Sequence, residues 1–244
     1  MNNNYKRTIF SWSMYDFANQ PFTTLIITFI YSTYFVKVIA PDEIIGTVLW
    51  SRGIAITAIV VALISPLMGA IADQGGYRKV SLIFWTWVCI IGSFFSFYAL
   101  PGEITKALFW VVLANIGFEM GGVFCNAYLP HIAPKEKIGR ISGYGWSFGY
   151  VGGLIALVIV MILFVSPEIP AFGFSTENGE NIRATNLLVA IWFAIFSIPT
   201  FLFVKDKPIS KRISISLVKS SYAQIRNTFR EIKRYKQTSR FLIA

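Results

Sequence analysis

The sequence predicts an all-α integral membrane protein with six transmembrane helices, and three observations lead to this prediction. Hydrophobic residues make up 55% of the 244 positions and charged residues only 14%, whereas soluble domains carry roughly 45–50% apolar and 25% charged residues. The apolar residues form six runs, each long enough (about 20 residues) to cross a bilayer. Most of the 22 Lys and Arg residues lie between or after those runs. Little sequence is left for a separate soluble core.

A hydropathy reading places the six spans in order along the chain. They cover residues 10–36, 48–72, 80–100, 107–129, 143–165 and 186–204. The first run follows Lys6 and Arg7, but it is too long for the core of a signal peptide and lacks a small-x-small cleavage pattern. We therefore expect it to remain as the first helix. Cys89 and Cys125 lie inside apolar runs without metal-ligand neighbours, so we interpret them as small packing residues.

The distribution of cations predicts how the chain crosses the membrane. The formal net charge is +10, and because the cations flank apolar runs we attribute it to a membrane surface rather than to nucleic acid. If the N-terminus is cytoplasmic, the outside segments hold only Lys37, Arg52, Lys106 and Arg183. The positive-inside rule therefore predicts that the N-terminus and the segment after the sixth span are both cytoplasmic. The few charged extramembrane residues suit a bacterial cytoplasmic membrane, and a vacuolar membrane is compatible.

These patterns divide the chain into a transmembrane bundle at 1–204, a basic cytoplasmic linker at 205–240 and an apolar run at 241–244. Apolar residues repeat along the linker at the spacing of an amphipathic helix: Val218, Tyr222, Ile225, Phe229 and Ile232. The intervening cations predict contact with anionic lipid at the cytoplasmic leaflet; the alternative is packing against another protein element. The run at 241–244 resembles the start of a seventh span. We therefore expect a fragment whose partner is a missing C-terminal half or a second chain.

The clearest motif lies in the short loop between the second and third spans, with the sequence GAIADQGGYRK at 69–79. It contains a glycine, an aspartate, a second glycine and a basic pair: Gly69, Asp73, Gly76, Arg78 and Lys79. This arrangement resembles the loop signature of the major facilitator superfamily, with Gln74 in place of the usual basic residue. The resemblance implies the N-terminal half of a facilitator fold, built from two three-helix repeats.

The residue types in this loop also have direct physical roles. Gly69 permits close approach of a neighbouring helix, and Gly76 permits a turn with positive φ. Asp73 lies near the C-terminal end of its own helix, where the dipole disfavours an anion, so it needs a cation or a foreign helix N-terminus as its partner. The resemblance implies that this aspartate latches two transporter halves together in one conformation. The alternative is a charged turn that only sets topology.

The fifth span is rich in glycine, and Gly145, Gly149 and Gly153 form a small-xxx-small stripe that allows close helix crossing. The run RISGYGWSFGYVGG at 140–153, together with YDFANQ at 15–20, resembles the autophagy-related vacuolar amino-acid effluxer family and its bacterial relatives. That resemblance covers most of residues 10–204. It implies secondary active export of amino acids or similar small solutes by alternating access, with proton coupling as one option.

Polar residues inside the spans mark a candidate solute path, because a carboxylate at that depth costs about 2.5–3.5 kcal/mol and usually faces a cavity or a partner. On the fourth span, helical spacing puts four residues on one face: Asn115, Glu119, Gly122 and Asn126. A second stripe lies on the first span: Asp16, Asn19, Gln20, Thr23 and Thr24. Pro21 removes a backbone donor beside this stripe and can free a carbonyl toward a cavity. The superfamily resemblance implies that both spans line the central cavity.

We predict that Glu119 is the proton-titrating or amine-binding carboxylate and that Asp16 assists it. The alternatives are a protonated or paired structural role for Glu119 and a hydrated surface position for Asp16. Aromatic residues near span ends are interpreted as interface anchors: Trp12, Tyr15, Trp85, Trp87, Trp110 and Trp146. The sequence shows no Ser/His/Asp set, zinc-ligand cluster or Walker loop, so we expect no enzyme, metal or cofactor. A non-transporting membrane scaffold, or a half-transporter that needs a partner chain, is the competing function.

Overall fold

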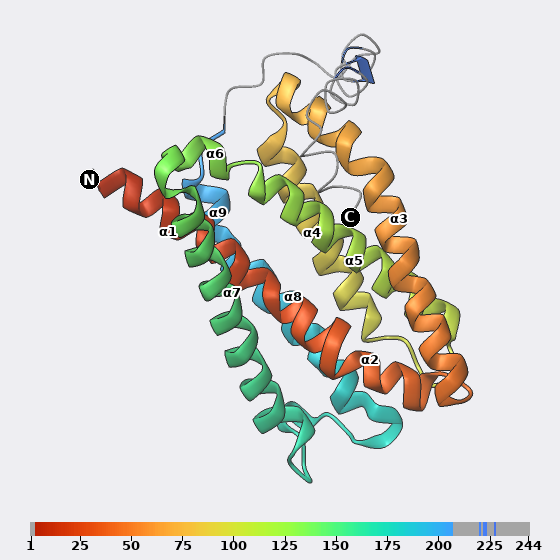
Figure 1. Cartoon of the computed structure of the whole chain (residues 1–244). Helices are drawn as coiled ribbons and strands as arrows, with labels where there is room; N and C mark the ends of the chain where they lie inside the picture. The colour runs from red at the N-terminus through yellow and green to blue at the C-terminus, as the bar shows by residue number, and fades with distance from the viewer. Residues whose placement is uncertain (1–2, 207–219, 221, 224–226, 228–244) are drawn as a thin grey trace.

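The computed structural model describes residues 3–206 together with Ser220, Tyr222, Ala223 and Asn227, and the regular structure in that part of the chain is helical (Figure 1). Within the described residues, six helical segments are long and apolar enough to cross a membrane, which confirms the predicted fold class. Most of the predicted linker helix and the apolar run at 241–244 lie outside the described residues. The division of the chain at 204 and 240 therefore stays a prediction.

The first span is one helical run in four segments of alternating geometry: α1 (Asn3–Pro21), the π-helical η1 (Phe22–Phe29), α2 (Tyr31–Tyr34) and the π-helical η2 (Phe35–Ile39). The next three spans and the short helices after them are α3 (Glu43–Gly75), α4 (Arg78–Ser96), α5 (Ile104–Asn126), α6 (Leu129–Ile132) and η3 (Lys135–Lys137). The remaining elements are α7 (Ile138–Val160), η4 (Met161–Val165), η5 (Ala171–Gly173), η6 (Glu177–Gly179), α8 (Glu180–Phe196) and α9 (Ile198–Phe203).

The contacts between the six spans form matching pairs across the two halves of the bundle. The first span packs on the fifth through α1 and α7, and the fourth packs on the second through α5 and α3 (Figure 1). The third and sixth spans, α4 and α8, pack on each other. If spans one to three and four to six are two repeats, the contact between spans one and five has its counterpart in the contact between spans four and two. Inverted three-helix repeats produce this reciprocity.

Glycine allows the closest of these contacts between helix backbones. A Cβ placed on Gly92 of α4 would lie 2.8 Å from the Cβ of Ala114 on α5. A Cβ on Gly117 of α5 would lie 2.8 Å from the backbone oxygen of Trp85 on α4. Because real Cβ atoms essentially never approach other atoms within 3.0 Å, α4 and α5 can cross at this distance only with glycine at both positions.

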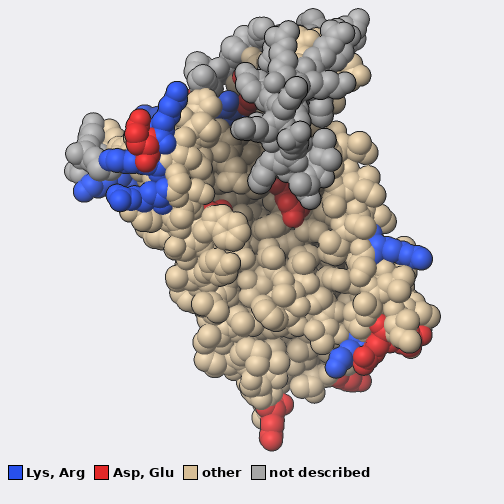
Figure 2. Space-filling view, viewed as in Figure 1, with Lys and Arg blue, Asp and Glu red and all other residues tan. Residues whose placement is uncertain are grey.

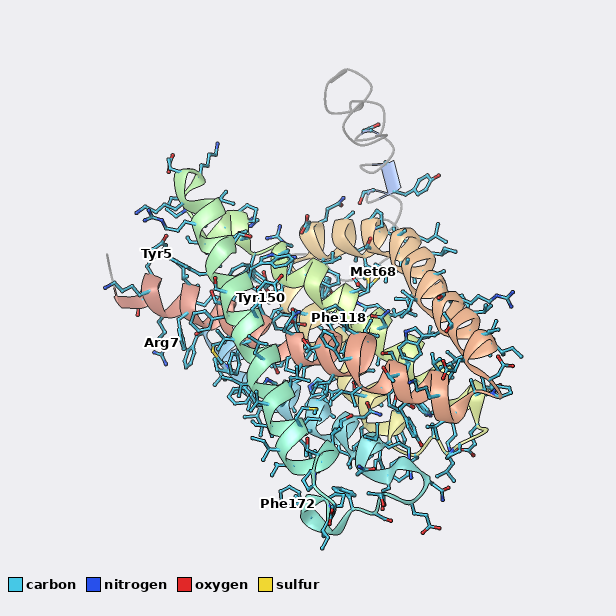
Figure 3. The ribbon with its side chains drawn as sticks, turned by 60° about the horizontal axis from the view of Figure 1, so that its bottom comes forward. Tyr5, Arg7, Met68, Phe118, Tyr150 and Phe172 are labelled. Carbon is cyan, nitrogen blue, oxygen red and sulfur yellow. The ribbon has the colours of Figure 1, made fainter. Side chains whose placement is uncertain are left out.

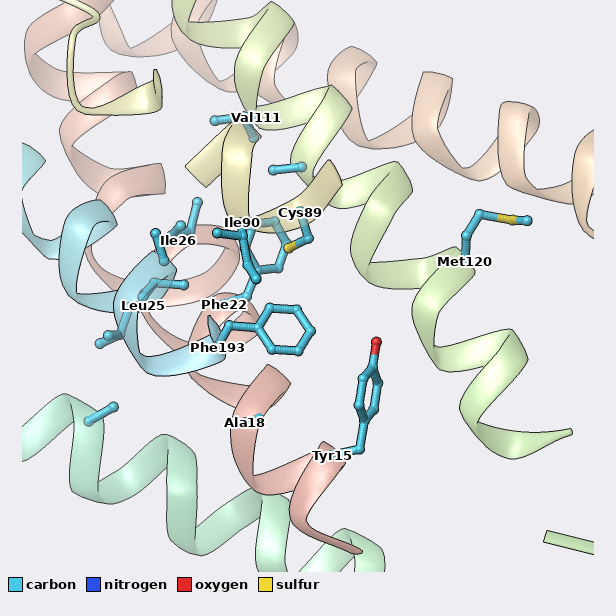
Figure 4. Close-up of a cluster of buried hydrophobic side chains, with 14 of the residues drawn as sticks. Tyr15, Ala18, Phe22, Leu25, Ile26, Cys89, Ile90, Val111, Met120 and Phe193 are labelled. Atoms are coloured by element: carbon cyan, nitrogen blue, oxygen red, sulfur yellow. The ribbon is translucent and has the colours of Figure 1, made fainter. Parts of the chain in front are cut away.

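The buried core is centred on the first span and α4. Tyr15, Phe22, Cys89 and Phe193 converge there from four helical segments (Figure 4). The Tyr15 hydroxyl is hydrogen-bonded to Oγ1 of Thr86 at 2.8 Å.

Two aromatic residues of α1 contradict their predicted role as interface anchors. Trp12 and Tyr15 are both fully buried. The Trp12 indole Nε1 donates to the backbone oxygen of Cys125 at 2.9 Å. The interpretation was wrong because other helices cover this part of α1, so the polar atoms of both rings find partners inside the protein instead of in lipid headgroups.

The molecular surface fits a membrane-spanning protein. On the face shown in Figure 2, charged side chains lie mostly toward the two ends, with a broad band between them that is largely free of charge. Little of the apolar stretch of α3 is covered by protein, and its exposed residues include Ile56, Ile59 and Leu63. Such a surface faces lipid or another apolar protein surface.

Candidate functional site

A cavity of about 460 Å³ lies between α1, α5 and α7. Its lining combines carboxylates, side-chain amides and aromatic rings: Asp16, Asn19, Gln20, Thr23, Phe118, Glu119, Gly122, Val123, Asn126, Trp146, Gly149 and Tyr150. Ligand-binding cavities in proteins typically have volumes of about 300–1,000 Å³. This cavity is therefore large enough to hold a small solute.

The structure brings together most of the polar residues predicted for the solute path. Asp16, Asn19 and Gln20 approach the cavity from α1, and Glu119 and Asn126 approach it from α5. Both polar stripes therefore face a common space, as their helical spacing indicated.

Asn115 does not line this cavity, although the spacing placed it on the same face as Glu119. It is buried one turn earlier on α5, beside Ala114, which is in close contact with Gly92 of α4. Asn115 therefore lies outside the described lining of this cavity, and its place on the solute path stays a prediction.

The glycine stripe of α7 makes room for the Asp16 side chain. A Cβ on Gly145 would collide with Oδ2 of Asp16 and would lie 2.9 Å from the ring of Trp12. A Cβ on Gly149 would lie 3.5 Å from the Cβ of Asp16. Further along, a Cβ on Gly153 would lie 2.7 Å from Oγ1 of Thr24. The stripe thus serves both close packing on α1 and the position of a carboxylate.

Pro21 has a different effect from the one expected. Proline at position 21 cannot donate to the carbonyl four residues earlier, which belongs to Phe17. That carbonyl accepts a hydrogen bond from the indole Nε1 of Trp192 on α8 at 3.1 Å, and Gly152 of α7 lies against it. The expectation that it faces the cavity was wrong, because the Trp192 indole on α8 supplies a donor for it.

The charges of the cavity are unbalanced. Asp16 and Glu119 make no hydrogen bond or ion pair with any residue that the structure describes. Among the described residues, the lining contains no Lys, Arg or His. Asn19, only 6% exposed, also lacks a side-chain hydrogen bond within the described residues. The cavity therefore presents negative charge and a free amide to whatever enters it.

The aromatic side of the cavity was not predicted. Trp146 and Tyr150 of α7 are 66% and 59% exposed, and their ring centroids lie 6.0 Å apart. In Figure 3, Tyr150 and Phe118 lie toward the middle of the molecule, whereas Tyr5 and Phe172 lie at its edge. Sequence spacing carried a usable signal, because Trp146 and Tyr150 directly follow Gly145 and Gly149 and so flank the packing stripe.

The facilitator-type loop lies apart from the cavity lining. Gly76 ends α3 with φ of 77°, a left-handed conformation that favours glycine. The Asp73 carboxylate accepts from Nε of Arg78 at 2.6 Å, and Nη1 of Arg78 lies 3.1 Å from Nε2 of His131. A Cβ on Gly69 would meet no described atom within 4 Å, so the expected close helix approach at Gly69 was wrong for this part of the chain.

The basic residue after Arg78 connects the loop to the end of the sixth span. The backbone N–H of Lys79, in the first turn of α4, donates to Oδ2 of Asp206 at 2.8 Å. The Lys79 ammonium donates to the backbone oxygen of Val204 at 3.2 Å. A carboxylate at the N-terminus of a helix satisfies a free donor and complements the helix dipole. Together, Arg78 and Lys79 connect the start of the third span to the ends of the second, fourth and sixth spans.

These features define the class of protein. The structure is a six-helix bundle of two reciprocal three-helix repeats, with a polar cavity on its first and fourth spans and the facilitator-type loop after its second span. It is the N-terminal half of a major facilitator-type transporter fold. The profile of the family described as "Vacuole effluxer Atg22 like" matches residues 46–244. The chain belongs to this family, as the motifs in the first and fifth spans indicated.

Individual relatives agree with this assignment. The chain is 24% identical over 250 residues to the MFS-type transporter YxiO of Bacillus subtilis, covering 96% of this chain and 55% of YxiO. It is 27% identical over 207 residues to a protein of Aquifex aeolicus, covering 84% and 47%. It is 23% identical over 217 residues to autophagy-related protein 22 of Yarrowia lipolytica, covering 66% and 35%. The chain thus spans about half the length of the two bacterial relatives.

Proposed function

We propose that this chain forms half of a secondary transporter that exports amino acids or similar small solutes by alternating access. The observation that carries the proposal is the convergence of Asp16 and Glu119 on one cavity between three membrane-spanning segments. Family membership supports transport, and the family is described as one of vacuole effluxers.

Glu119 is the central residue of the proposed mechanism. It lies near the middle of the fourth span, Ile104–Ile132, and has no partner among the described residues. An ionised carboxylate at that depth is costly unless a proton or a cationic group neutralises it. Binding of a proton or of a solute amine at Glu119 would therefore favour different conformations of the protein, which is the basis of coupled transport.

A second six-helix unit completes the proposed path. The described lining of the cavity comes from α1, η1, α5 and α7, and the aromatic residues Trp146 and Tyr150 remain largely uncovered. The two bacterial relatives are about twice as long as the region they share with this chain. A matching unit, on the same polypeptide or on another, would enclose the solute from the open side, and the exposed Asp73 would be available to latch the two units.

The proposed orientation places α6 and the facilitator-type loop in the cytoplasm. This end of the bundle carries Arg78, Lys79, Lys135, Lys137 and Arg140. Anionic lipid at a cytoplasmic leaflet would stabilise such a cluster by about 1 kcal/mol for each cation near the surface. A bacterial cytoplasmic membrane is the proposed location.

Flux measurements test the proposed role of Glu119. The full-length protein is reconstituted into sealed vesicles, and efflux of labelled amino acids is followed with and without a pH gradient. Glu119→Gln, which keeps the shape but removes the titratable group, should lower gradient-driven flux at least about tenfold. Glu136→Gln is the matched control, because Glu136 lies on the exposed turn η3, away from the cavity.

The variant must remain folded for this comparison. We expect Glu119→Gln to insert into the membrane and to elute as a single species in detergent, because Glu119 makes no described contact that substitution would remove. Flux by Glu119→Gln equal to that of the unmodified protein would reject the assigned role. Absence of solute flux in the unmodified protein would leave the scaffold function as the better account.

A further inference from the structure

The cavity carries a net negative charge on its described walls. Asp16 and Glu119 contribute two carboxylates, and no Lys, Arg or His is among the described residues that line the same space. Neither carboxylate has an ion-pair partner within the described residues. Two anions in a space bounded by apolar helices are stabilised most effectively by a cationic ligand.

The aromatic rings of α7 supply a second feature that favours a cation. Trp146 and Tyr150 line the cavity, lie 6.0 Å apart at an interplanar angle of 44°, and are largely uncovered by other side chains. Indole and phenol rings carry negative charge on their faces and attract ammonium and guanidinium groups within about 6 Å. Aromatic residues that only fill a core would be buried, as Trp12 and Tyr15 are.

A buried amide provides the third, independent observation. Asn19 lines the cavity and is only 6% exposed. Its side chain makes no hydrogen bond within the described residues. Because the amide has no described partner and lies at the cavity wall, it is available to hydrogen-bond with a ligand or with solvent in the cavity. The carbonyl oxygen of the Asn19 side chain can accept from an N–H group of a bound cation.

From these three features we infer that the cavity selects solutes with a net positive charge, carried by an ammonium or guanidinium group that lies between the carboxylates of Asp16 and Glu119 and the rings of Trp146 and Tyr150. That the bound solute is then moved across the membrane rests on the proposed function. A neutral solute would leave both carboxylates uncompensated. A zwitterion would bring its own carboxylate close to Asp16 and Glu119, and like charges at short range repel each other.

Binding measurements on the full-length protein in lipid nanodiscs test this inference without requiring transport. Two cations of different shape serve as probes, each paired with a neutral compound of the same shape: choline with 3,3-dimethyl-1-butanol, and putrescine with 1,4-butanediol. Isothermal titration calorimetry measures each dissociation constant. At least one cation should bind saturably and at least about tenfold more tightly than its neutral counterpart, which corresponds to about 1.4 kcal/mol.

Variants identify the groups responsible. Trp146→Leu and Tyr150→Leu should each weaken binding of the cation at least about threefold, and should leave the weak binding of the neutral compound unchanged. Trp87→Leu and Tyr144→Leu are matched controls, because these aromatic residues are exposed but do not line the cavity. Asp16→Asn should also weaken binding of the cation, since it removes one of the two charges.

The outcomes separate this inference from the proposed function. Selective cation binding that depends on Trp146 and Tyr150 supports the inference even if no solute flux is found. Equal affinity for cations and neutral compounds, or no saturable binding of either cation, overturns it. In that case Glu119-dependent flux of neutral or zwitterionic amino acids would still support the transporter proposal.

Discussion

Gly152 is the residue at which α7 meets the backbone of α1 most directly. A Cβ at this position would lie 3.0 Å from the carbonyl carbon of Phe17 and closer still to its oxygen. Because these are backbone atoms inside a packed helix pair, they cannot rotate away as a flexible side chain could. Gly143, more than two turns earlier on the same helix, has open space around it.

This difference predicts opposite effects for two substitutions of the same type. Gly152→Ala should lower the free energy of unfolding by about 1–3 kcal/mol, the usual cost of overpacking. Gly143→Ala should be neutral or stabilising by up to about 1 kcal/mol, because alanine favours the helix. Denaturation by SDS in mixed micelles measures both. Equal stability of the two variants would contradict the close contact at Phe17.

Sequence could locate the charged residues of the cavity but not its aromatic ones. Asp16 and Glu119 stand out because a carboxylate within an apolar run needs a specific reason. Trp146 lies near the end of a span, where lipid headgroups, a buried core or a cavity are all compatible with an aromatic ring. The choice between these depends on which helix lies opposite, and a single sequence does not contain that information.

At the scale of elements, the backbone hydrogen bonding of the first span is interrupted at Pro21, and a side chain of another helix supplies the missing donor. α1 ends at Pro21, and the next eight residues follow π-helical geometry. The Trp192 indole on α8 donates to the carbonyl of Phe17, which Pro21 cannot serve. In the apolar interior of a membrane protein, an unpaired carbonyl would be costly. The hydrogen bond therefore connects the irregular turn in span one to span six.

Removing the indole donor of Trp192 should destabilise the protein, and restoring a backbone donor at position 21 should recover part of the lost stability. Trp192→Phe leaves the Phe17 carbonyl without its side-chain donor and should lower the free energy of unfolding by about 1–3 kcal/mol. Adding Pro21→Ala supplies an N–H four residues after Phe17 and should recover part of that loss. Trp87→Phe is the control, because Trp87 is exposed and donates no hydrogen bond within the described residues.

The two changes form a double-mutant cycle measured by thermal unfolding in detergent. A coupling free energy near zero between Trp192→Phe and Pro21→Ala would show that the two groups do not compete for the same carbonyl.

The extents of the six spans were largely predictable, and the errors have physical causes. Hydropathy placed the start of the second span at 48, whereas α3 begins at Glu43 because Asp42 caps it by accepting from the N–H of Ile45 at 2.8 Å. The sixth helix likewise begins at Glu180 rather than 186. A hydropathy scale measures transfer into lipid, so it does not detect the polar first turn of a helix. The π-helical segments and the short helix α6 also left no hydropathy signal.

At the scale of the whole molecule, the two ends of the bundle differ in charge, and this predicts which compartment each faces. Lys137 lies on the exposed turn η3 at the α6 end, and Glu168 lies on the exposed loop at the other end. Cys89 and Cys125 are buried, so they should react slowly with polar reagents. The chain therefore suits labelling at single introduced cysteines.

A membrane-impermeant maleimide should label Glu168→Cys in intact cells. It should label Lys137→Cys only after the membrane is opened, because the positive-inside rule places the basic end in the cytoplasm. The unmodified protein is the background control. The reverse pattern would show that the chain has the opposite orientation.

Family membership and helix number followed from sequence, but the neighbour relations of the helices did not. The motif at 69–79 identified the class, and six apolar runs gave the spans. Hydropathy says only that each helix is apolar. Which helix packs on which is decided by close contacts such as those at Gly92, Gly117 and Gly152, and none of these three glycines belongs to the small-xxx-small stripe that the sequence shows.

The reciprocal packing of the spans has a consequence for how the protein is made. The main partner of α1 is α7, and the main partner of both α3 and α4 is α5; both partners follow in the second repeat. Ribosomal synthesis delivers the spans in order, so the first repeat enters the bilayer before most of its contacts exist. Those three helices, including α1 with its Asp16, therefore remain loosely associated in lipid or beside the insertion machinery until the later helices are made. Folding of the nascent chain is thus delayed until the fourth span emerges, and it proceeds by interleaving two repeats rather than by adding one helix at a time.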